Sequence, residues 1–364
     1  MRKSTFLRTS WLPLILILIQ ADPAAAQFYA QHNLVSDGAV PEGLVDPNLV
    51  NAWGLASSPT SPWWISDNGT GRSTLYNVGT GSIPLIVTVP GAMGKRSAPT
   101  GLVFNGGTGF VVNNGAGTSP ARFIFASEDG TISGFRGVPV VLAVNNSASG
   151  AVYKGLAIAS TATGDFIYAT NFHAGAVDVF DSKFKPVHTP GAFTDRTLPE
   201  GYAPFGIQNL GGAIYVTYAL QNADKHDDVP GEGHGFVDAF DTAGNLVRRV
   251  ASKGRLNSPW GLALAPADFG FFSGDLLVAN FGDGHINAFD PERLRGNGEY
   301  QQRGMFHSAD GPPLAIDGLW AIAFGSGAPS NGPTNTLFFT AGPDGEQHGL
   351  FGTLVVDAPP HQNQ

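Results

Sequence analysis

Acidic and imidazole side chains are concentrated between residues 219 and 235, in a chain with only 13% charged residues. Carboxylate oxygens are the ligands that Ca²⁺ takes, and imidazole is a common ligand for Zn²⁺. The spacing does not match an EF-hand loop, so the stretch predicts either a metal site of another design or a solvated polar loop. The candidate ligands in it are His226, Asp227, Asp228, Glu232 and His234.

Three further histidines, His173, His285 and His348, each follow an apolar run that ends in a turn-rich segment. A catalytic zinc site needs three protein ligands, which loops that converge at one point can supply. The chain has no HExxH motif, so this prediction depends on the loops being brought together by the fold. The alternative is that these histidines lie apart and bond to the backbone of their own turns.

An internal repeat sets the positions of these loops. A short glycine-centred phrase leads into an apolar strand, then a second strand ends in a polar pair. A third strand ends in an aromatic residue and usually Asp, and a weaker fourth strand follows. Units of roughly 50 residues with four strands are typical of β-propeller blades. The repeated positions are Gly54, Gly101, Gly155, Gly206 and Gly261, with Ala321 in the sixth place.

The sixth unit is short by one strand, while the segment 28–35 reads as a strand with no partner. We therefore expect an all-β, six-bladed β-propeller of four-stranded blades, whose ring is closed by this N-terminal strand in the last blade. Closure removes two sheet edges that would otherwise be open. The alternative is a disordered N-terminal arm.

In a propeller the strand openings and the loops between second and third strands share one face, around the mouth of the channel. The indoles of Trp53 and Trp260 can stack a sugar there, or fill the space between blades. Asn side chains at the ends of the second strands form a ring of amide oxygens for a polar ligand, or stabilise their own turns. The candidate binding residues are Trp53, Lys154, Trp260, Asn68, Asn114, Asn171 and Asn280.

The first 26 residues read as a signal peptide, with a basic start, a short apolar run and a small-residue cleavage site at Ala24–Ala26. We expect residues 27–364 to form one exported domain, periplasmic or extracellular. The apolar run is shorter than the roughly 20 residues of a membrane span, and no later segment reaches that length.

Composition excludes several classes of function. The formal net charge is −9 and no basic cluster is present, so nucleic acid is a poor partner. The absence of cysteine excludes disulfides, thiol catalysis and cysteine-ligated metals. We expect a monomer that binds a small molecule, a glycan or a protein.

The repeat resembles that of NHL-like six-bladed propellers. The phrases Asn33–Asp37, Asp46–Leu55 and Trp64–Gly71 resemble more closely an uncharacterised family of exported bacterial propellers. Some members of that family carry a PEP-CTERM sorting tail, but residues 357–364 have neither Pro-Glu-Pro nor an apolar anchor. The resemblance implies a fold and an export route, and no activity.

Some NHL-like lactonases and lyases are similar in holding a metal over the channel, but the opening phrases here contain no Glu for such a site. We expect a ligand-binding or interaction module that uses the loop-rich face. The alternative is a metal-dependent hydrolase or lyase with His and Asp ligands, and a weaker alternative is a structural component of an extracellular matrix. Fold alone does not choose among these three classes.

Overall fold

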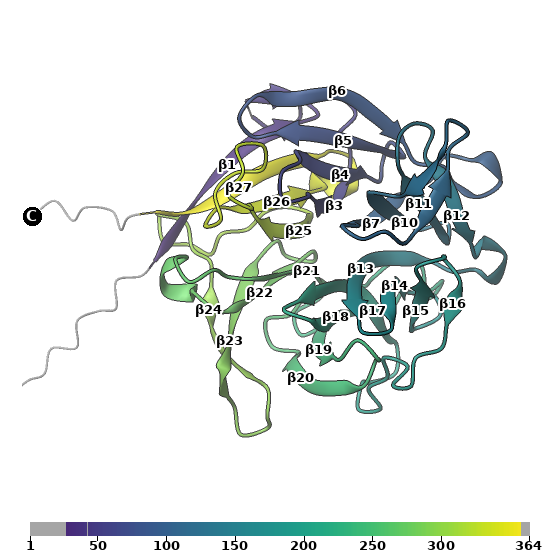
Figure 1. The fold of residues 1–364 in the computed structure, drawn as a ribbon. Helices are drawn as coiled ribbons and strands as arrows, with labels where there is room; N and C mark the ends of the chain where they lie inside the picture. Colours follow the sequence, from purple (N-terminus) through teal and green to yellow (C-terminus); the bar gives the residue numbers. More distant parts are fainter. Residues whose placement is uncertain (1–26, 42, 358–364) are drawn as a thin grey trace, which may run out of the picture.

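The computed structural model describes residues 27–41 and 43–357 and confirms the all-β architecture. Six sheets are arranged in a ring around a central channel (Figure 1). The predicted signal peptide, residues 1–26, and residues 358–364 lie outside the described residues. Within these residues, no helix has the length and apolar character that a membrane crossing needs.

The first three blades run outward from their innermost strands. Blade one comprises β3 (Ala52–Ala56), β4 (Trp63–Asp67), β5 (Arg72–Asn77) and β6 (Gly81–Thr88). Blade two comprises β7 (Pro99–Phe104), β10 (Phe123–Ser127), β11 (Thr131–Phe135) and β12 (Val141–Asn145). Blade three comprises β13 (Tyr153–Thr161), β14 (Gly164–Asn171), β15 (Ala176–Asp181) and β16 (Pro186–Val187).

The remaining blades complete the ring. Blade four comprises β17 (Tyr202–Leu210), β18 (Ala213–Leu220), β19 (Phe236–Phe240) and β20 (Leu246–Ser252). Blade five comprises β21 (Pro259–Leu264), β22 (Leu276–Asn280), β23 (Ile286–Leu294) and β24 (Tyr300–Met305). Blade six comprises β25 (Leu319–Phe324), β26 (Leu337–Ala341), β27 (Leu350–Asp357) and β1 (Phe28–Ser36), with the short β2 (Leu44–Val45) added outside β1.

The N-terminal strand closes the ring as expected. Strand β1 pairs antiparallel with β27, from Phe28 opposite Asp357 to Ser36 opposite Leu350. The ring of Tyr29 stacks on Phe306 of the neighbouring blade, with 3.8 Å between their centroids. The first strand of the chain is therefore joined to blade six by its backbone and to blade five by its side chains.

Blade two differs from the prediction. The segment 110–114, expected to be its second strand, contains instead β8 (Val111–Asn113), which pairs only with β9 (Thr118–Pro120). This two-stranded hairpin is inserted after the innermost strand. The true second strand is β10, in which all five residues are buried and which ends in the turn before Thr131. The second strand therefore ends at Ser127, 13 positions after Asn114, where the sequence predicted its end.

The repeated opening glycines are required by the approach of neighbouring blades. A Cβ atom at Gly206 would lie 2.1 Å from the carbonyl oxygen of Trp260, and one at Gly54 would lie 2.3 Å from that of Thr100. Both carbonyls belong to the innermost strand of the next blade, so any side chain would force these strands apart. The repeat thus reflects the packing of the ring, because six inner strands must fit around a narrow axis.

Aromatic side chains close the channel at the loop-rich face. Trp53 stacks on Trp320 with a centroid distance of 3.6 Å, and Trp260 meets both rings edge-on. Phe281 stacks on the other face of Trp320 at 3.9 Å. We call Trp53, Trp260, Trp320 and Phe281 the aromatic floor. At the opposite end, where the inner strands finish, the channel widens into a cavity of about 300 Å³.

Candidate functional site

A buried lysine lies at the mouth of the channel, above the aromatic floor. Lys154 is the second residue of β13, and its side chain is only 2% exposed. Its ammonium forms ion pairs with Glu128, in the turn between β10 and β11, and with Asp227, in the long loop between β18 and β19. Burial alone would lower the pKa of Lys154, but the two carboxylates outweigh it and raise that pKa. Lys154 is therefore a fixed positive charge at neutral pH.

His226 and Asp227 present a coupled imidazole and carboxylate on the solvent side of this lysine. Nδ1 of His226 lies 2.8 Å from Oδ1 of Asp227, and their side chains are 46% and 61% exposed. This hydrogen bond is the main cause that raises the pKa of His226, and it also lowers the pKa of Asp227. The imidazole therefore keeps its proton to a higher pH than an ordinary histidine does.

Glu128 completes the group and was not identified from the sequence. Its Oε2 accepts a hydrogen bond of 2.8 Å from Nδ2 of Asn68, and its Oε1 faces Lys154. It follows Ser127, the last residue of β10, so it holds the place in blade two that Asn68 holds in blade one. The sequence signal that could have identified Glu128 is the acidic pair Glu128–Asp129 before Gly130. The inserted hairpin obscured this signal, because it has the pattern of a second strand.

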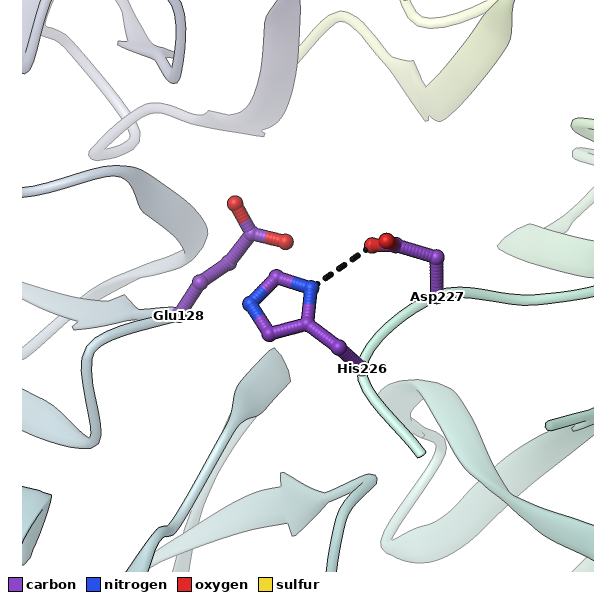
Figure 2. A group of neighbouring side chains, drawn as sticks. All are labelled: Glu128, His226 and Asp227. Atoms are coloured by element: carbon purple, nitrogen blue, oxygen red, sulfur yellow. Dashed lines mark hydrogen bonds and ion pairs between the residues drawn. The ribbon is translucent and has the colours of Figure 1, made fainter. Parts of the chain in front are cut away.

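Glu128, His226 and Asp227 approach closely enough to share a metal ion. One ligand atom from each lies within 4.8 Å of the others, and Figure 2 shows the two carboxylates pointing toward one another with the imidazole beside them. Two oxygens and one nitrogen suit a divalent cation such as Zn²⁺ or Mn²⁺. The same carboxylates already contact the ammonium of Lys154, so a bound metal competes with an internal cation. We call Glu128, Lys154, His226 and Asp227 the channel-mouth cluster.

A buried hydrogen-bond network fixes the aromatic floor beneath this cluster. Oδ1 of Asn51 accepts hydrogen bonds from the indoles of Trp53, at 2.9 Å, and Trp320, at 3.1 Å. Its Nδ2 donates to Glu346 at 2.6 Å and to Asn68 at 3.3 Å. Burial raises the pKa of Glu346, although the bond from Asn51 opposes it. The floor and the charged cluster are thus linked through Asn68.

The long loop of blade four divides into residues that join the cluster and residues that do not. Asp228 is partly buried beside it, and burial raises the pKa of this carboxyl. Glu232 is exposed. Nδ1 of His234 lies 2.8 Å from the carbonyl oxygen of Val229, within the same loop. Of the five residues proposed as ligands here, His226 and Asp227 belong to the group of Figure 2.

The other predicted histidines lie outside this group. Nδ1 of His285 lies 3.5 Å from Oδ1 of Asp283, which belongs to the same turn. Nδ1 of His348 is 2.7 Å from Asp37, which raises the pKa of His348. The ring of His173 lies near Gly150, in the connection between blades two and three. Among the described residues, the close group of three ligating side chains includes one of the five loop histidines, His226.

The predicted asparagines have different environments. Asn68 reaches the cluster through Glu128. Asn171 donates to Asp178 at 3.0 Å, and Asn280 donates to the carbonyl oxygen of Arg255 at 2.7 Å. Asn114 lies just after the hairpin strand β8, where its Nδ2 donates to the carbonyl oxygen of Val138. The position expected for Asn114, at the end of the second strand, is taken by Ser127 and Glu128.

The two tryptophans proposed for sugar stacking are both buried. Trp53 is 2% exposed and Trp260 is 9% exposed. The indole of Trp260 donates to the carbonyl oxygen of Lys154 at 3.0 Å, which ties the floor to the cluster. The Lys154 ammonium lies 5.2 Å from the centroid of the Trp53 ring. Neither indole offers an open face to a sugar, so the expected stacking surface is corrected to a packed layer that supports a charged site.

Solved structures of β-propeller proteins are similar to this chain over most of its length. A structural genomics protein of unknown function from Bacteroides thetaiotaomicron is 12% identical, with a TM-score of 0.54 over 91% of this chain and 76% of that one. A streptogramin B lyase structure is also 12% identical, with a TM-score of 0.50 over 91% of this chain and 98% of that one. At this identity the likeness shows the fold alone.

Relatives found by sequence have a higher identity to this chain than these solved structures. No family model matches the chain. The uncharacterized protein R648 of Acanthamoeba polyphaga mimivirus is 34% identical over 335 residues, covering 89% of this chain and 79% of the relative. Protein L690 of the same virus is 32% identical over 338 residues, covering 89% of this chain and 85% of the relative. Shared sequence over nearly the whole propeller shows that this chain belongs to the same protein family as mimivirus R648 and L690.

Proposed function

We propose that the protein is a ligand-binding module whose ligand sits on the channel-mouth cluster. The observation that carries this proposal is the convergence of Glu128, Lys154 and Asp227, from three different blades, on one point above the aromatic floor. The pKa of the buried Lys154 is raised and that of Asp227 is lowered, and shifted pKa values in a concave site are typical of functional sites. An exposed imidazole and carboxylate on a rigid floor favour a polar ligand over an apolar one.

A ligand-observed NMR screen of polar small molecules tests this proposal. Compounds that bind the protein should lose affinity in Glu128→Gln, which keeps the shape of the side chain and removes its charge. Glu292→Gln is the matched control, because Glu292 is an exposed carboxylate in β23. Compounds that bind equally to both variants, or a screen without any binder, would contradict the proposal.

A second candidate is a metal-dependent hydrolase or lyase. It is supported by Glu128, His226 and Asp227, whose ligand atoms lie within 4.8 Å of one another. A divalent metal there would supply Lewis-acid chemistry, and the ammonium of Lys154 would hold a nearby anionic group. A streptogramin B lyase structure shares the fold, so the fold is compatible with a lyase.

Elemental analysis of protein purified without a His-tag distinguishes the two candidates. The metal-dependent enzyme should retain one divalent ion per chain, and Asp227→Asn together with His226→Gln should release it. A metal-free protein that does not bind Zn²⁺ or Mn²⁺ in calorimetry contradicts this second candidate and leaves the binding module. We further propose that the chain is exported by its N-terminal signal, for which mass spectrometry should find a mature terminus near Gln27.

A further inference from the structure

A second hollow lies directly beside the channel-mouth cluster. Its volume is about 330 Å³, which is within the range of small-molecule sites. The connection between β6 and β7 and the connection between β12 and β13 form its walls, and the turn that carries Glu128 and Asp129 lies between them. We call this hollow the rim pocket. It shares Glu128 with the cluster, so one ligand can occupy both.

The unpaired charges of the rim pocket are positive. Its acidic residues are already engaged: Asp129 accepts hydrogen bonds from the backbone of Ala92, at 2.6 Å, and from Thr131, at 2.7 Å, while Glu128 is paired with Lys154. Lys95 and Arg96 line the same pocket.

Both of these cationic side chains are exposed, and neither forms an ion pair within residues 27–41 and 43–357. The chain has a net charge of −9, yet these two cations are adjacent in the sequence and both line the pocket. A guanidinium and an ammonium together suit a carboxylate, sulfate or phosphate group.

The wall beside these cations has an adaptable apolar side chain. Met93 lines the pocket, is 80% exposed, and has a φ of 53°, in the left-handed region that non-glycine residues rarely adopt. Such backbone strain is concentrated at binding and catalytic sites. An unbranched thioether can repack against ligands of different shape. Ala151 and Val152 add apolar surface on the opposite wall.

We propose that the rim pocket binds the anionic end of a small-molecule ligand. The anionic group contacts Lys95 and Arg96, the apolar body packs against Met93, and the far end reaches Glu128 and the channel-mouth cluster. This inference rests on the function proposed above and adds the ligand class: a small molecule with one carboxylate, sulfate or phosphate group at one end and a polar group at the other.

Pairs of compounds that differ only in charge test this class. The probes are para-hydroxybenzoate and para-hydroxyphenyl phosphate, each an anion, and para-hydroxybenzamide, a neutral match to the first. Nitrogen–proton correlation NMR should show saturable shifts at the backbone amides of Met93, Ser147 and Gly150 with the anions. The neutral amide should bind about tenfold more weakly or not at all. Preference between the two anions shows whether the natural group is a carboxylate or a phosphate.

Charge-removing variants locate the binding. Lys95→Gln with Arg96→Gln should weaken anion binding by about tenfold or more. Lys183→Gln with Lys185→Gln is the matched control, because both residues are exposed in the turn between β15 and β16 and the change in net charge is equal. Unchanged anion binding in the first double variant, equal binding of the amide, or no binding of either anion would overturn the proposal.

Glu128→Gln separates this inference from the proposed function. If anion binding survives in Glu128→Gln and is lost in the Lys95/Arg96 variant, the rim pocket is supported and the cluster is contradicted as the second anchor. If anion binding is lost only in Glu128→Gln, the cluster is supported and the rim pocket is overturned. Near-ultraviolet circular dichroism of each variant confirms that the comparison is made between folded proteins.

Discussion

Nζ of Lys154 lies 3.1 Å from Oδ1 of Asp227, although the two residues are 73 positions apart in the sequence and belong to different blades. One partner is 2% exposed and the other 61% exposed. The pair therefore joins the interior of the propeller to the long loop between β18 and β19. A change in the charge of either residue is expected to affect both the stability of the channel mouth and the position of that loop.

Replacing Lys154 with Met should destabilise the protein. The substitution keeps most of the apolar stem but leaves Glu128, whose side chain is 14% exposed, without its cation. Removing one partner of a buried pair costs roughly 3 kcal/mol. Urea denaturation measures the change, and Lys183→Met serves as the control at an exposed lysine. Adding Glu128→Gln to Lys154→Met should restore part of the loss. A Lys154→Met variant as stable as the parent would show that the pair is unimportant for folding.

The same Lys154→Met substitution should strengthen binding of a divalent cation. It removes the ammonium that competes for Glu128 and Asp227 while leaving the three ligating side chains in place. We expect an increase in Zn²⁺ affinity of about tenfold or more, measured by calorimetry. Adding His226→Ala should reverse the gain. Equal Zn²⁺ affinity in the parent and in Lys154→Met would mean that the lysine and the metal do not compete.

Metal binding should depend on pH through His226. Asp227 raises the pKa of this imidazole above its usual value of about 6.5, and only the neutral ring ligates a metal. Zn²⁺ affinity should therefore rise as the pH increases through the raised pKa. The stability that the hydrogen bond to Asp227 contributes has the opposite pH dependence. It is fully present below the pKa that His226 has in the unfolded chain, and it is lost as the pH rises through the raised pKa of the folded protein. Zn²⁺ affinity, measured between about pH 6 and pH 8, should change with pH at different slopes in the parent and in His226→Gln. Parallel curves would contradict the role of His226 as the titrating ligand.

Gly206→Ala should be strongly destabilising, because its Cβ atom would lie 2.1 Å from the carbonyl oxygen of Trp260. Forcing two inner strands apart costs roughly 3 kcal/mol. Gly296→Ala is the control, since a Cβ there meets nothing within 4 Å and the change should stay within about 0.5 kcal/mol. Thermal unfolding of both variants checks the prediction, and equal melting temperatures would show that the inner strands can move apart freely.

The sequence predicted the fold because the propeller repeats one packing rule. Gly54 and its equivalents recur wherever an inner strand meets the next blade, and the missing strand of blade six pointed to Phe28–Ser36. The site was predicted only in part. His226, Asp227 and Lys154 were named from their loops and openings.

The remaining features of the site depend on contacts between distant parts of the chain. Glu128 was missed because the hairpin β8–β9 has the pattern of a second strand and shifted the expected end of blade two. Trp53 and Trp260 stand at blade openings, and their burial follows from packing on Trp320 and from the bond of Trp260 to Lys154, which both lie in other blades. Spacing along the chain does not report such neighbours.

The antiparallel ladder between β1 and β27 also sets the mechanical behaviour of the ring. Its outermost pair is Phe28 and Asp357, so the two chain ends enter the ladder at the same point. Tension between these ends loads the hydrogen bonds one after another, as in opening a zipper, and does not shear them together. The propeller should therefore resist heat through its closed ring yet yield at low force when pulled from its ends, with blade six opening first.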